Sequence, residues 1–340
     1  TREIPTLALA KELNPTLTID GVQSLLLQLV EEGFIFYDKQ KEMVYVKDKT
    51  FNYVFASAGK KDYDIIAIPS VTKEPNALLN LKNYDLNVNG ISQFYLSDSQ
   101  FVLIYPKDDK LTIKKNRDML FDGTIVSGNI DFKGTNFYFS YDTFNIKMNA
   151  VDSMILYVES TEIDDNGNPL YLPVNTNISV TSGRLQIDKT DNKSSKVHHK
   201  EYSIFTTYDY SIADYEKPTI FDNVYDKEEF YFKLDPFTLE SSDSLDYRKV
   251  KFDGTMISDG IFPDFREALK LQEDRSLGFK TTTPAGGFPT YGKLGKYTGN
   301  LTLSNQGFRG SGTIDFMASK SQSTDIIFFP DSTLEKVEDF

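Results

Sequence analysis

The chain offers two histidines and no cysteine for catalysis or metal binding. His198 and His199 are adjacent, within a polar stretch that covers residues 188–200. Neighbouring side chains of an extended segment point in opposite directions, so these two rings are not expected to share one metal or one substrate. Catalytic and metal-bound histidines also need a partner that orients the ring. We therefore expect both in a solvated loop, which leaves a Ser–His–Asp triad without a base and a zinc hydrolase without imidazole ligands.

Other familiar kinds of active site are missing as well. The lack of cysteine excludes thiol catalysis, disulfides, iron–sulfur clusters and Cys-ligated zinc. No Gly-x-Ser-x-Gly elbow and no Walker-type phosphate loop occurs. We assign no catalytic residue, no cofactor-binding residue and no cofactor, and we expect that the chain is not an enzyme. Glycoside hydrolysis by two carboxylates is the surviving exception, because spacing along the chain does not single out such a pair.

Two oxygen-rich segments leave a calcium site open. The first is Asp164-Asp165-Asn166-Gly167-Asn168, and the second gathers Asp188, Asp191 and Asn192. The first segment lacks the glutamate that completes an EF-hand loop and is flanked by strand-like runs, so a hairpin turn explains it equally. Metal binding is left unknown by the sequence.

Composition restricts the partners. The 340 residues carry a formal net charge of −13, from 50 acidic and 37 basic side chains. That average field repels nucleic acid and anionic membrane surfaces, so neither is an expected partner. No apolar run reaches the length of a membrane span, and the longest candidate, residues 22–30, is interrupted by glutamines. The chain begins with Thr1 and shows no signal-peptide pattern, so we expect a processed or excised part of a longer protein.

The first fifty residues have a helical pattern. Pro5 is placed to open a helix that runs to Leu13, and Asp20 with Gln23 predicts a capping box for a second helix. Five apolar residues at helical spacing follow (Val22, Leu25, Leu26, Leu29 and Val30), and Gly33 suits the end of that helix. Residues 34–37 and 43–46 then predict a hairpin. This order is the outline of a winged-helix unit, but residues 21–32 contain no Lys or Arg, so we expect a packing or protein-contact subdomain and not a DNA reader.

From about residue 50 the pattern is one of short β-type runs broken by turn residues. The runs are 65–68, 101–105, 111–113, 124–126, 136–139, 154–158, 184–187 and 325–329, and the turn signals are the Asn-Gly or Asp-Gly pairs at 89–90, 122–123, 166–167 and 253–254. One helix is expected at 263–272 and a long ordered loop at 281–295. The predicted fold is mainly β: an elongated antiparallel sandwich or β-solenoid-like body with a small N-terminal helix–helix–hairpin subdomain. The predicted boundaries are 1–50 for the subdomain and 51–340 for the body, with 51–200 and 201–340 as candidate halves of the body.

Short segments recur within the body. Phe121-Asp122-Gly123-Thr124 returns at 252–255, a Tyr-Phe-x-x-Asp-x-Phe pattern at 138–144 returns at 231–237, and Ser-Gly-x-Ile-Asp-Phe at 127–132 returns at 311–316. The intervals differ, which fits similar β rungs repeated at irregular distances. If the first pair are equivalent rungs, both Asp-Gly pairs should lie in the same kind of turn, with both phenylalanines directed into a core.

Residues 80–330 resemble a known group of proteins. The segment Gly286-Gly287-Phe288-Pro289-x-Tyr291-Gly292 and the segment from Leu303 to Gly312, Leu-Ser-Asn-Gln-Gly-Phe-Arg-Gly-Ser-Gly, are similar to large β-rich cell-envelope proteins of Bacteroidetes, as is the heavy use of Asn, Lys, Phe and Tyr. The resemblance implies part of a longer protein in the periplasm, the outer membrane or outside the cell. It carries no catalytic motif.

Taken together, these observations favour a non-catalytic structural or protein-interaction module of a larger envelope protein, with an outer-membrane complex as a candidate setting. Exposed strand edges or loop aromatics would contact the other protein. The alternative is a carbohydrate-active or carbohydrate-binding β-protein, for which tyrosines would have to replace the absent tryptophan as sugar platforms.

Overall fold

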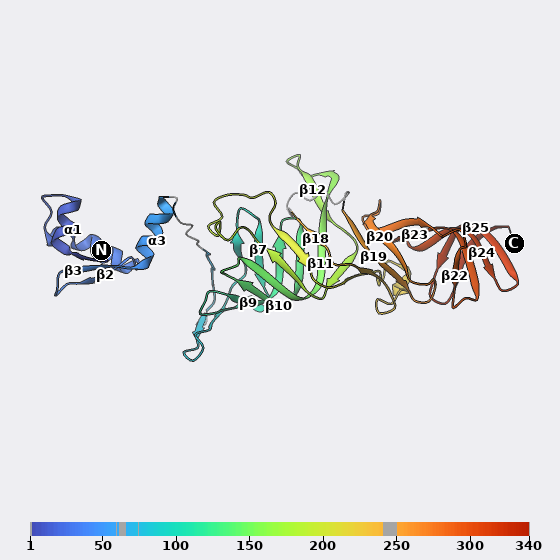
Figure 1. Ribbon diagram of the computed structural model, residues 1–340, viewed down its shortest axis with the longest axis horizontal. Helices are drawn as coiled ribbons and strands as arrows, with labels where there is room; N and C mark the ends of the chain where they lie inside the picture. The colour runs from blue at the N-terminus through green and yellow to red at the C-terminus, as the bar shows by residue number, and fades with distance from the viewer. Residues whose placement is uncertain (1, 59, 61–65, 74, 241–249, 340) are drawn as a thin grey trace. The chain divides into compact units, whose positions relative to one another are not determined.

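The computed structural model describes residues 2–58, 60, 66–73, 75–240 and 250–339, and it is mainly β (Figure 1). The chain divides into two compact units: Thr1–Ile65 with Lys189–Lys196, and Ile66–Asp188 with Val197–Phe340. We call them the N-terminal unit and the β unit and describe each by itself. The boundary predicted at residue 50 falls inside helix α3 (Asp48–Ser57). No helix within the described ranges has the length and apolarity that crossing a membrane requires.

The N-terminal unit confirms the predicted helix–helix–hairpin order. Its elements are β1 (Glu3–Pro5), α1 (Thr6–Leu13), α2 (Ile19–Glu31), β2 (Ile35–Asp38), β3 (Met43–Val46) and α3. The strand β1 was not predicted, and it pairs with β3 to complete a three-stranded sheet in the order β1-β3-β2.

Local chemistry explains where α2 begins and which side it buries. Thr18, and not the predicted Asp20, is the N-cap, and its side chain accepts a hydrogen bond from the Gly21 N–H at 3.2 Å. Val22 and Leu26 are buried as predicted, whereas Leu29 is only partly buried. They pack with Ala10, Ile35 and Val44 in a small core.

The β unit is built from antiparallel strands. Their bounds are β4 (Ala77–Leu79), β5 (Leu86–Asn89), β6 (Phe94–Ser97), β7 (Val102–Pro106), β8 (Lys110–Ile113), β9 (Met119–Ser127), β10 (Ile130–Ser140), β11 (Asn145–Ile163), β12 (Pro169–Pro173), β13 (Asn177–Val180), β14 (Gly183–Gln186), β15 (Ile204–Thr207), β16 (Ser211–Asp214), β17 (Phe230–Leu234), β18 (Thr238–Leu239), β19 (Lys251–Ser258), β20 (Phe265–Leu271), β21 (Leu277–Thr282), β22 (Phe288–Thr290), β23 (Gly295–Ser304), β24 (Gly307–Phe316), β25 (Ser319–Phe328) and β26 (Thr333–Asp339). Seven of the eight β runs named from the sequence lie in or overlap these strands. The exception is 65–68, of which residue 65 lies outside the described residues and residues 66–68 are not in a strand.

Two long strands, β9 and β11, bend, so that their two ends pair with different neighbours. One end of β9 pairs with β8 and the other with β7, while β11 pairs in succession with β14, β13 and β12. The bend lies where Gly123 of β9 faces Gly134 of β10. A Cβ on Gly134 would lie 2.2 Å from the Ala150 carbonyl oxygen, so only glycine allows the strands to approach this closely. The bend divides the sheet into two parts, which we call its branches.

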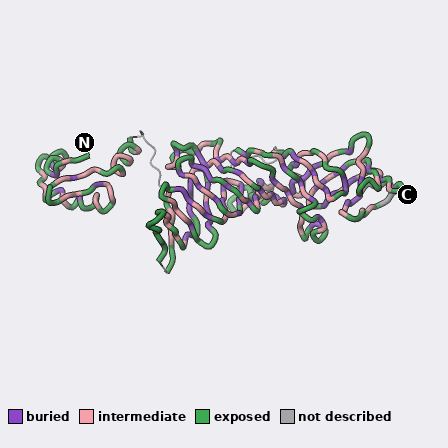
Figure 2. The backbone as a smooth tube through the Cα atoms, turned by 60° about the horizontal axis from the view of Figure 1, so that its bottom comes forward, coloured by how far each residue is buried: buried purple, intermediate pink, exposed green. Residues whose placement is uncertain are grey.

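The two branches of the sheet face each other across an aromatic core. Phe132 lies on the branch that contains β13 and contacts Phe205 on the branch that contains β15, with ring centroids 4.6 Å apart. Phe205 also contacts Phe237, which in turn contacts Phe252 of β19. Buried and exposed positions alternate along the strands, as Figure 2 shows by its purple and green segments. The result is the predicted antiparallel β body with one core face and one solvent face.

A second set of strands repeats the arrangement of facing glycines. Gly299 of β23 faces Gly312 of β24, and one end of β23 pairs with β22 while the other pairs with β21. A Cβ on either glycine would lie 2.7 Å from the Cα atom of the other. The prediction of one long loop at 281–295 was wrong, because this segment contains the last two residues of β21, strand β22 and the first residue of β23.

The sequence echo is confirmed in part. Phe121 and Phe252 are both buried in strands, as predicted for equivalent rungs. The prediction of turns was wrong, because Gly123 and Gly254 both lie inside strands. A Cβ on either one would lie 2.2 Å from a carbonyl oxygen of the adjacent strand, so these glycines serve close strand approach. The third echo differs, since Gly128 lies in a hairpin turn and Gly312 within a strand.

The helix predicted at 263–272 was wrong. Residues 265–271 form strand β20, which pairs with β19. The apolar residues Phe265, Leu269 and Leu271 satisfy a period of two as well as a helical spacing. The ladder with β19 places Leu269 opposite Phe252 in the core, and this tertiary pairing decides the outcome.

Candidate functional site

A two-stranded arm extends from the body at the end of β11. Residues 157–163 of β11 pair with β12, which among the described strands has no other partner in the ladder (Figure 1). The arm exposes three apolar side chains: Ile163 at 66%, Leu170 at 37% and Tyr171 at 48%. Isolated exposed hydrophobic residues are common. Ile163 lies opposite Pro169, so Ile163 and Tyr171 share one face of the hairpin and Leu170 lies on the other.

The turn that joins these strands is rigidly capped. The Asp164 side chain accepts hydrogen bonds from the backbone N–H groups of Asn166 at 2.9 Å and Asn168 at 2.8 Å. The backbone hydrogen bond from Asn168 is the largest cause that lowers the pKa of Asp164 from its usual value. Gly167 adopts a φ of +83°, which suits the turn. The first calcium candidate is thus a hairpin turn, and its first carboxylate already has donors.

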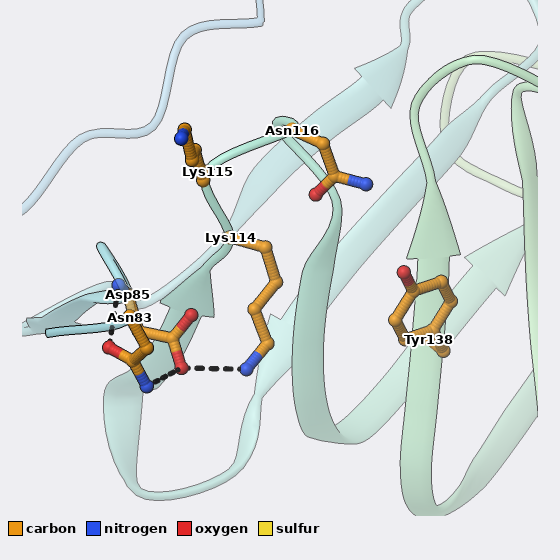
Figure 3. A pocket seen from close by; sticks show the side chains of 6 residues that line it. All are labelled: Asn83, Asp85, Lys114, Lys115, Asn116 and Tyr138. Carbon is orange, nitrogen blue, oxygen red and sulfur yellow. Dashed lines mark hydrogen bonds and ion pairs between the residues drawn. The ribbon is translucent and has the colours of Figure 1, made fainter.

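A second surface is a polar depression of about 510 Å³ at the edge of the sheet (Figure 3). Its lining comes from three places: the segment before β5, the β8–β9 turn and β10. The lining residues are Asn83, Asp85, Lys114, Lys115, Asn116 and Tyr138.

Both carboxylates near the depression already accept hydrogen bonds. Asp85 accepts one from Lys114 at 2.7 Å and one from the Asn83 amide at 2.9 Å, as the dashed lines of Figure 3 show. Asp118 accepts hydrogen bonds from the Tyr138 hydroxyl and from the Asn116 amide. These contacts fix the positions of the amides and of the tyrosine ring.

The tyrosine of the depression keeps its proton. Its hydroxyl donates to Asp118, and this hydrogen bond is the largest cause that raises the pKa of Tyr138 above its usual value. Tyr138 therefore acts as a neutral donor and a ring surface and not as a base. The arrangement is suited to holding a polar molecule.

The structure separates the two histidines, as predicted, but corrects their surroundings. His198 is exposed, and its Nδ1 lies 2.6 Å from the carbonyl oxygen of Ser99. His199 is only partly exposed, and its Nδ1 lies 2.7 Å from Oδ1 of the buried Asp188. Gln100 donates to the other oxygen of Asp188 at 3.2 Å. The loop is thus anchored to the sheet and not simply solvated, because His199 has an orienting carboxylate.

Glycoside hydrolysis by two carboxylates, the reaction that the sequence left open, would require an acid with a raised pKa. Burial raises the pKa of Asp131, whose Oδ2 accepts a hydrogen bond from Tyr157 at 2.9 Å. The pKa of Glu229 is raised by a hydrogen bond with Asp259, and Glu229 lies at the surface. Neither acid lines the depression of Figure 3. The two acids with a raised pKa, Asp131 and Glu229, therefore lie at other places in the β unit than the polar depression.

Within the ranges that the structure describes, no three side chains among His, Cys, Asp and Glu are grouped as metal ligands. In the second calcium candidate, Asp188 contacts His199 and Gln100 as given above.

Sequence reasoning missed both surfaces. The depression joins residues from 83 to 138, and only the strand register brings them together. The arm had a usable signal, because Leu170 and Tyr171 follow the Asn166-Gly167 pair after only two residues, Asn168 and Pro169.

Three comparisons with known proteins were made. Protein-family models, curated proteins and solved structures each yield no match to this chain.

Proposed function

We propose that this chain is a non-catalytic interaction module whose β11–β12 arm binds another protein. The observation that carries the proposal is the exposure of Ile163, Leu170 and Tyr171 on a hairpin with a capped turn. A hairpin of two strands is marginally stable in water unless its apolar side chains are covered. A partner protein would provide that cover.

The chemistry of β12 indicates how the partner would be bound. Pro169 and Pro173 stand at the two ends of the strand, and neither has a backbone N–H to donate. Prolines on an edge strand oppose the addition of a further strand. The contact would therefore be made by side chains, with Tyr171 as an aromatic anchor in a pocket of the partner.

A pair of substitutions tests the proposal in the cell that makes the protein. Tagged full-length protein carrying Leu170→Ser and Tyr171→Ser would be purified under native conditions beside the unmodified protein, and bound proteins would be identified by mass spectrometry. Loss of an aromatic anchor costs about 2 kcal/mol or more. We therefore expect a partner that binds the unmodified protein to be recovered at least about tenfold less with the variant.

A matched control separates the arm from general surface effects. Tyr95 of β6 and Leu334 of β26 are also exposed but lie on separate strands, and they would be changed to serine in the same way. The control should retain the partner. Recovery of the same proteins with both variants, or of no partner with the unmodified protein, would contradict the proposal.

The setting of this module is proposed from the sequence resemblance alone. We place it in a larger protein of the cell envelope, within an assembly at the outer membrane. Fractionation of cells with an antibody against the β unit tests this placement, and recovery in the cytoplasmic fraction would refute it.

A further inference from the structure

A row of outward side chains crosses three strands of the β unit beside the depression. The register places Tyr138 of β10 opposite Lys147 of β11, and Lys147 opposite Arg184 of β14. Residues opposite each other in antiparallel strands point to the same face, with Cβ atoms about 4.5–5.5 Å apart. Tyr138 also lines the depression, so the row and the depression form one continuous surface. We call Tyr138, Lys147, Arg184 and Tyr208 the cationic strip.

Three cations of this surface lie beside a tyrosine ring. Lys147 Nζ lies 5.9 Å from the ring centroid of Tyr138, and Arg184 Cζ lies 5.9 Å from that of Tyr208. In the depression, Lys115 Nζ lies 4.9 Å from the ring centroid of Tyr84. A cation over an aromatic ring is attracted by the quadrupole of the ring, which positions the charge without neutralising it.

The cations of the strip lack acidic partners. Over the described part of the chain, neither Lys147 nor Arg184 forms an ion pair with a carboxylate, and the same holds for Lys115. Lys114 differs, since it pairs with Asp85. In a chain of net charge −13, Lys115, Lys147 and Arg184 thus offer charge to an anionic ligand, whereas the carboxylates at the depression, Asp85 and Asp118, accept hydrogen bonds from Lys114 and Tyr138.

We propose that the cationic strip and the depression bind an acidic polysaccharide. Carboxylates of uronic acid units would be bound by Lys147 and by the guanidinium of Arg184, whose paired N–H groups match a carboxylate. The neighbouring strands space these two cations by a distance comparable to one sugar ring. The amides of Asn83 and Asn116 would accept and donate hydrogen bonds to sugar hydroxyls. The site lies apart from the arm and goes beyond the proposed protein contact.

A single-stranded nucleic acid also presents rings and negative charges, but the site fits it less well. Bases bind by stacking on open aromatic faces. The Tyr138 and Tyr84 rings already have an ammonium group beside them. Nucleic-acid binding also requires that many phosphates be neutralised, and the strip has two cations. Nucleic acid is therefore an outcome of the test and not the expected ligand.

The test uses three probes with the whole chain at low ionic strength. Polygalacturonate oligomers supply the carboxylates, their fully methyl-esterified form supplies the same sugars without charge, and a single-stranded DNA of equal charge supplies phosphates. Binding would be measured by isothermal titration calorimetry. We expect polygalacturonate to bind, and the ester and the DNA to bind at least about tenfold more weakly.

Variants then assign the binding to the strip. The pair Lys147→Gln and Arg184→Gln should weaken the binding of polygalacturonate at least about tenfold, because two charge-assisted hydrogen bonds are lost. The control pair Lys270→Gln and Lys280→Gln makes the same change of net charge at exposed positions of β20 and β21. It should change binding less than about twofold, as for remote surface charges.

Several results would overturn this proposal. They are no binding of polygalacturonate, equal binding of the ester or of the DNA, and an equal loss of binding in the two variant pairs. Circular dichroism of each variant establishes that a loss of binding is not a loss of fold.

Discussion

The substitution Gly134→Ala tests the bend that shapes the β unit. Gly134 is buried in β10, where an added Cβ would lie 2.2 Å from the Ala150 carbonyl oxygen and 3.1 Å from the Cα atom of Val151. Ordinary contact begins at 3.4 Å, so the Ala150 oxygen would have to move by about 1.2 Å, the difference between 3.4 and 2.2 Å. Both atoms belong to the backbone of β11, which cannot give way as a flexible side chain would.

The expected cost follows from two effects. Overfilling a packed site costs about 1–3 kcal/mol, and each ladder hydrogen bond weakened on β11 adds about 0.5–1.5 kcal/mol. We expect a loss of about 2–5 kcal/mol in the free energy of unfolding. For a unit of this size, each kcal/mol corresponds to roughly 2–4 °C in the melting temperature. The β unit should therefore melt about 5–15 °C below the unmodified protein.

The assay is thermal unfolding followed by circular dichroism at the β-sheet band, with Gly286→Ala as the matched control. Nothing lies within 4 Å of a Cβ built on Gly286, so the same chemical change there has no steric consequence. The control should melt within about 2 °C of the unmodified protein or slightly above it. If Gly134→Ala also melted within about 2 °C, the strands would not be held in close approach at this glycine, and our account of the bend would be refuted.

Three further predictions concern the core, alkaline pH and nucleic acid. Leu26→Ala should cost about 2–5 kcal/mol as a buried cavity, and should remove helical dichroism of the N-terminal unit, whereas Leu25→Ala, at a position 43% exposed, should cost far less. The contribution of Tyr225 to the free energy of unfolding should be fully present below pH 10 and should be lost as the pH rises toward about 12. Burial raises the pKa of Tyr225 from 10.0 to about 12, so the unfolded chain loses that proton first. Tyrosinate absorbance that completes before any unfolding would contradict this. The N-terminal unit should not shift duplex DNA at low salt, since α2 has no Lys or Arg, and a shifted band would disprove it.

Local patterns were sufficient for the first two helices and the hairpin of the N-terminal unit, whereas β1 and α3 were not predicted. The stripe of Val22 and Leu26 has the period of a helix, Gly33 with φ of +79° stands at its end, and the hairpin follows within a few residues. Each of these signals acts between neighbours in the sequence, so no knowledge of distant contacts was required. The same holds for the short β runs, in which alternation marks the core face.

Long-range pairing decided what the sequence could not predict. Residues 265–271 carry a spacing that fits a helix and a strand, and pairing with β19 selects the strand. Gly123 resembled a turn residue beside Asp122, yet its role depends on the carbonyl oxygen of Tyr105 on another strand. Tyr138, Lys147 and Arg184 form one row only because of the register of three strands, and no spacing along the chain reveals it.

The register of β11 connects both proposed surfaces. One end of this strand places Lys147 in the cationic strip, and the other end, at Ile163, forms the arm. Between them lies the irregularity opposite Lys133 and Gly134, where the pairing of β10 with β11 shifts. A shift of one residue on either side would turn Lys147 toward the core and move Met148 to the solvent. A β strand without the bulge would thus lose the strip while keeping the same composition. The glycine bend is for this reason a determinant of the proposed binding surface as well as of the fold.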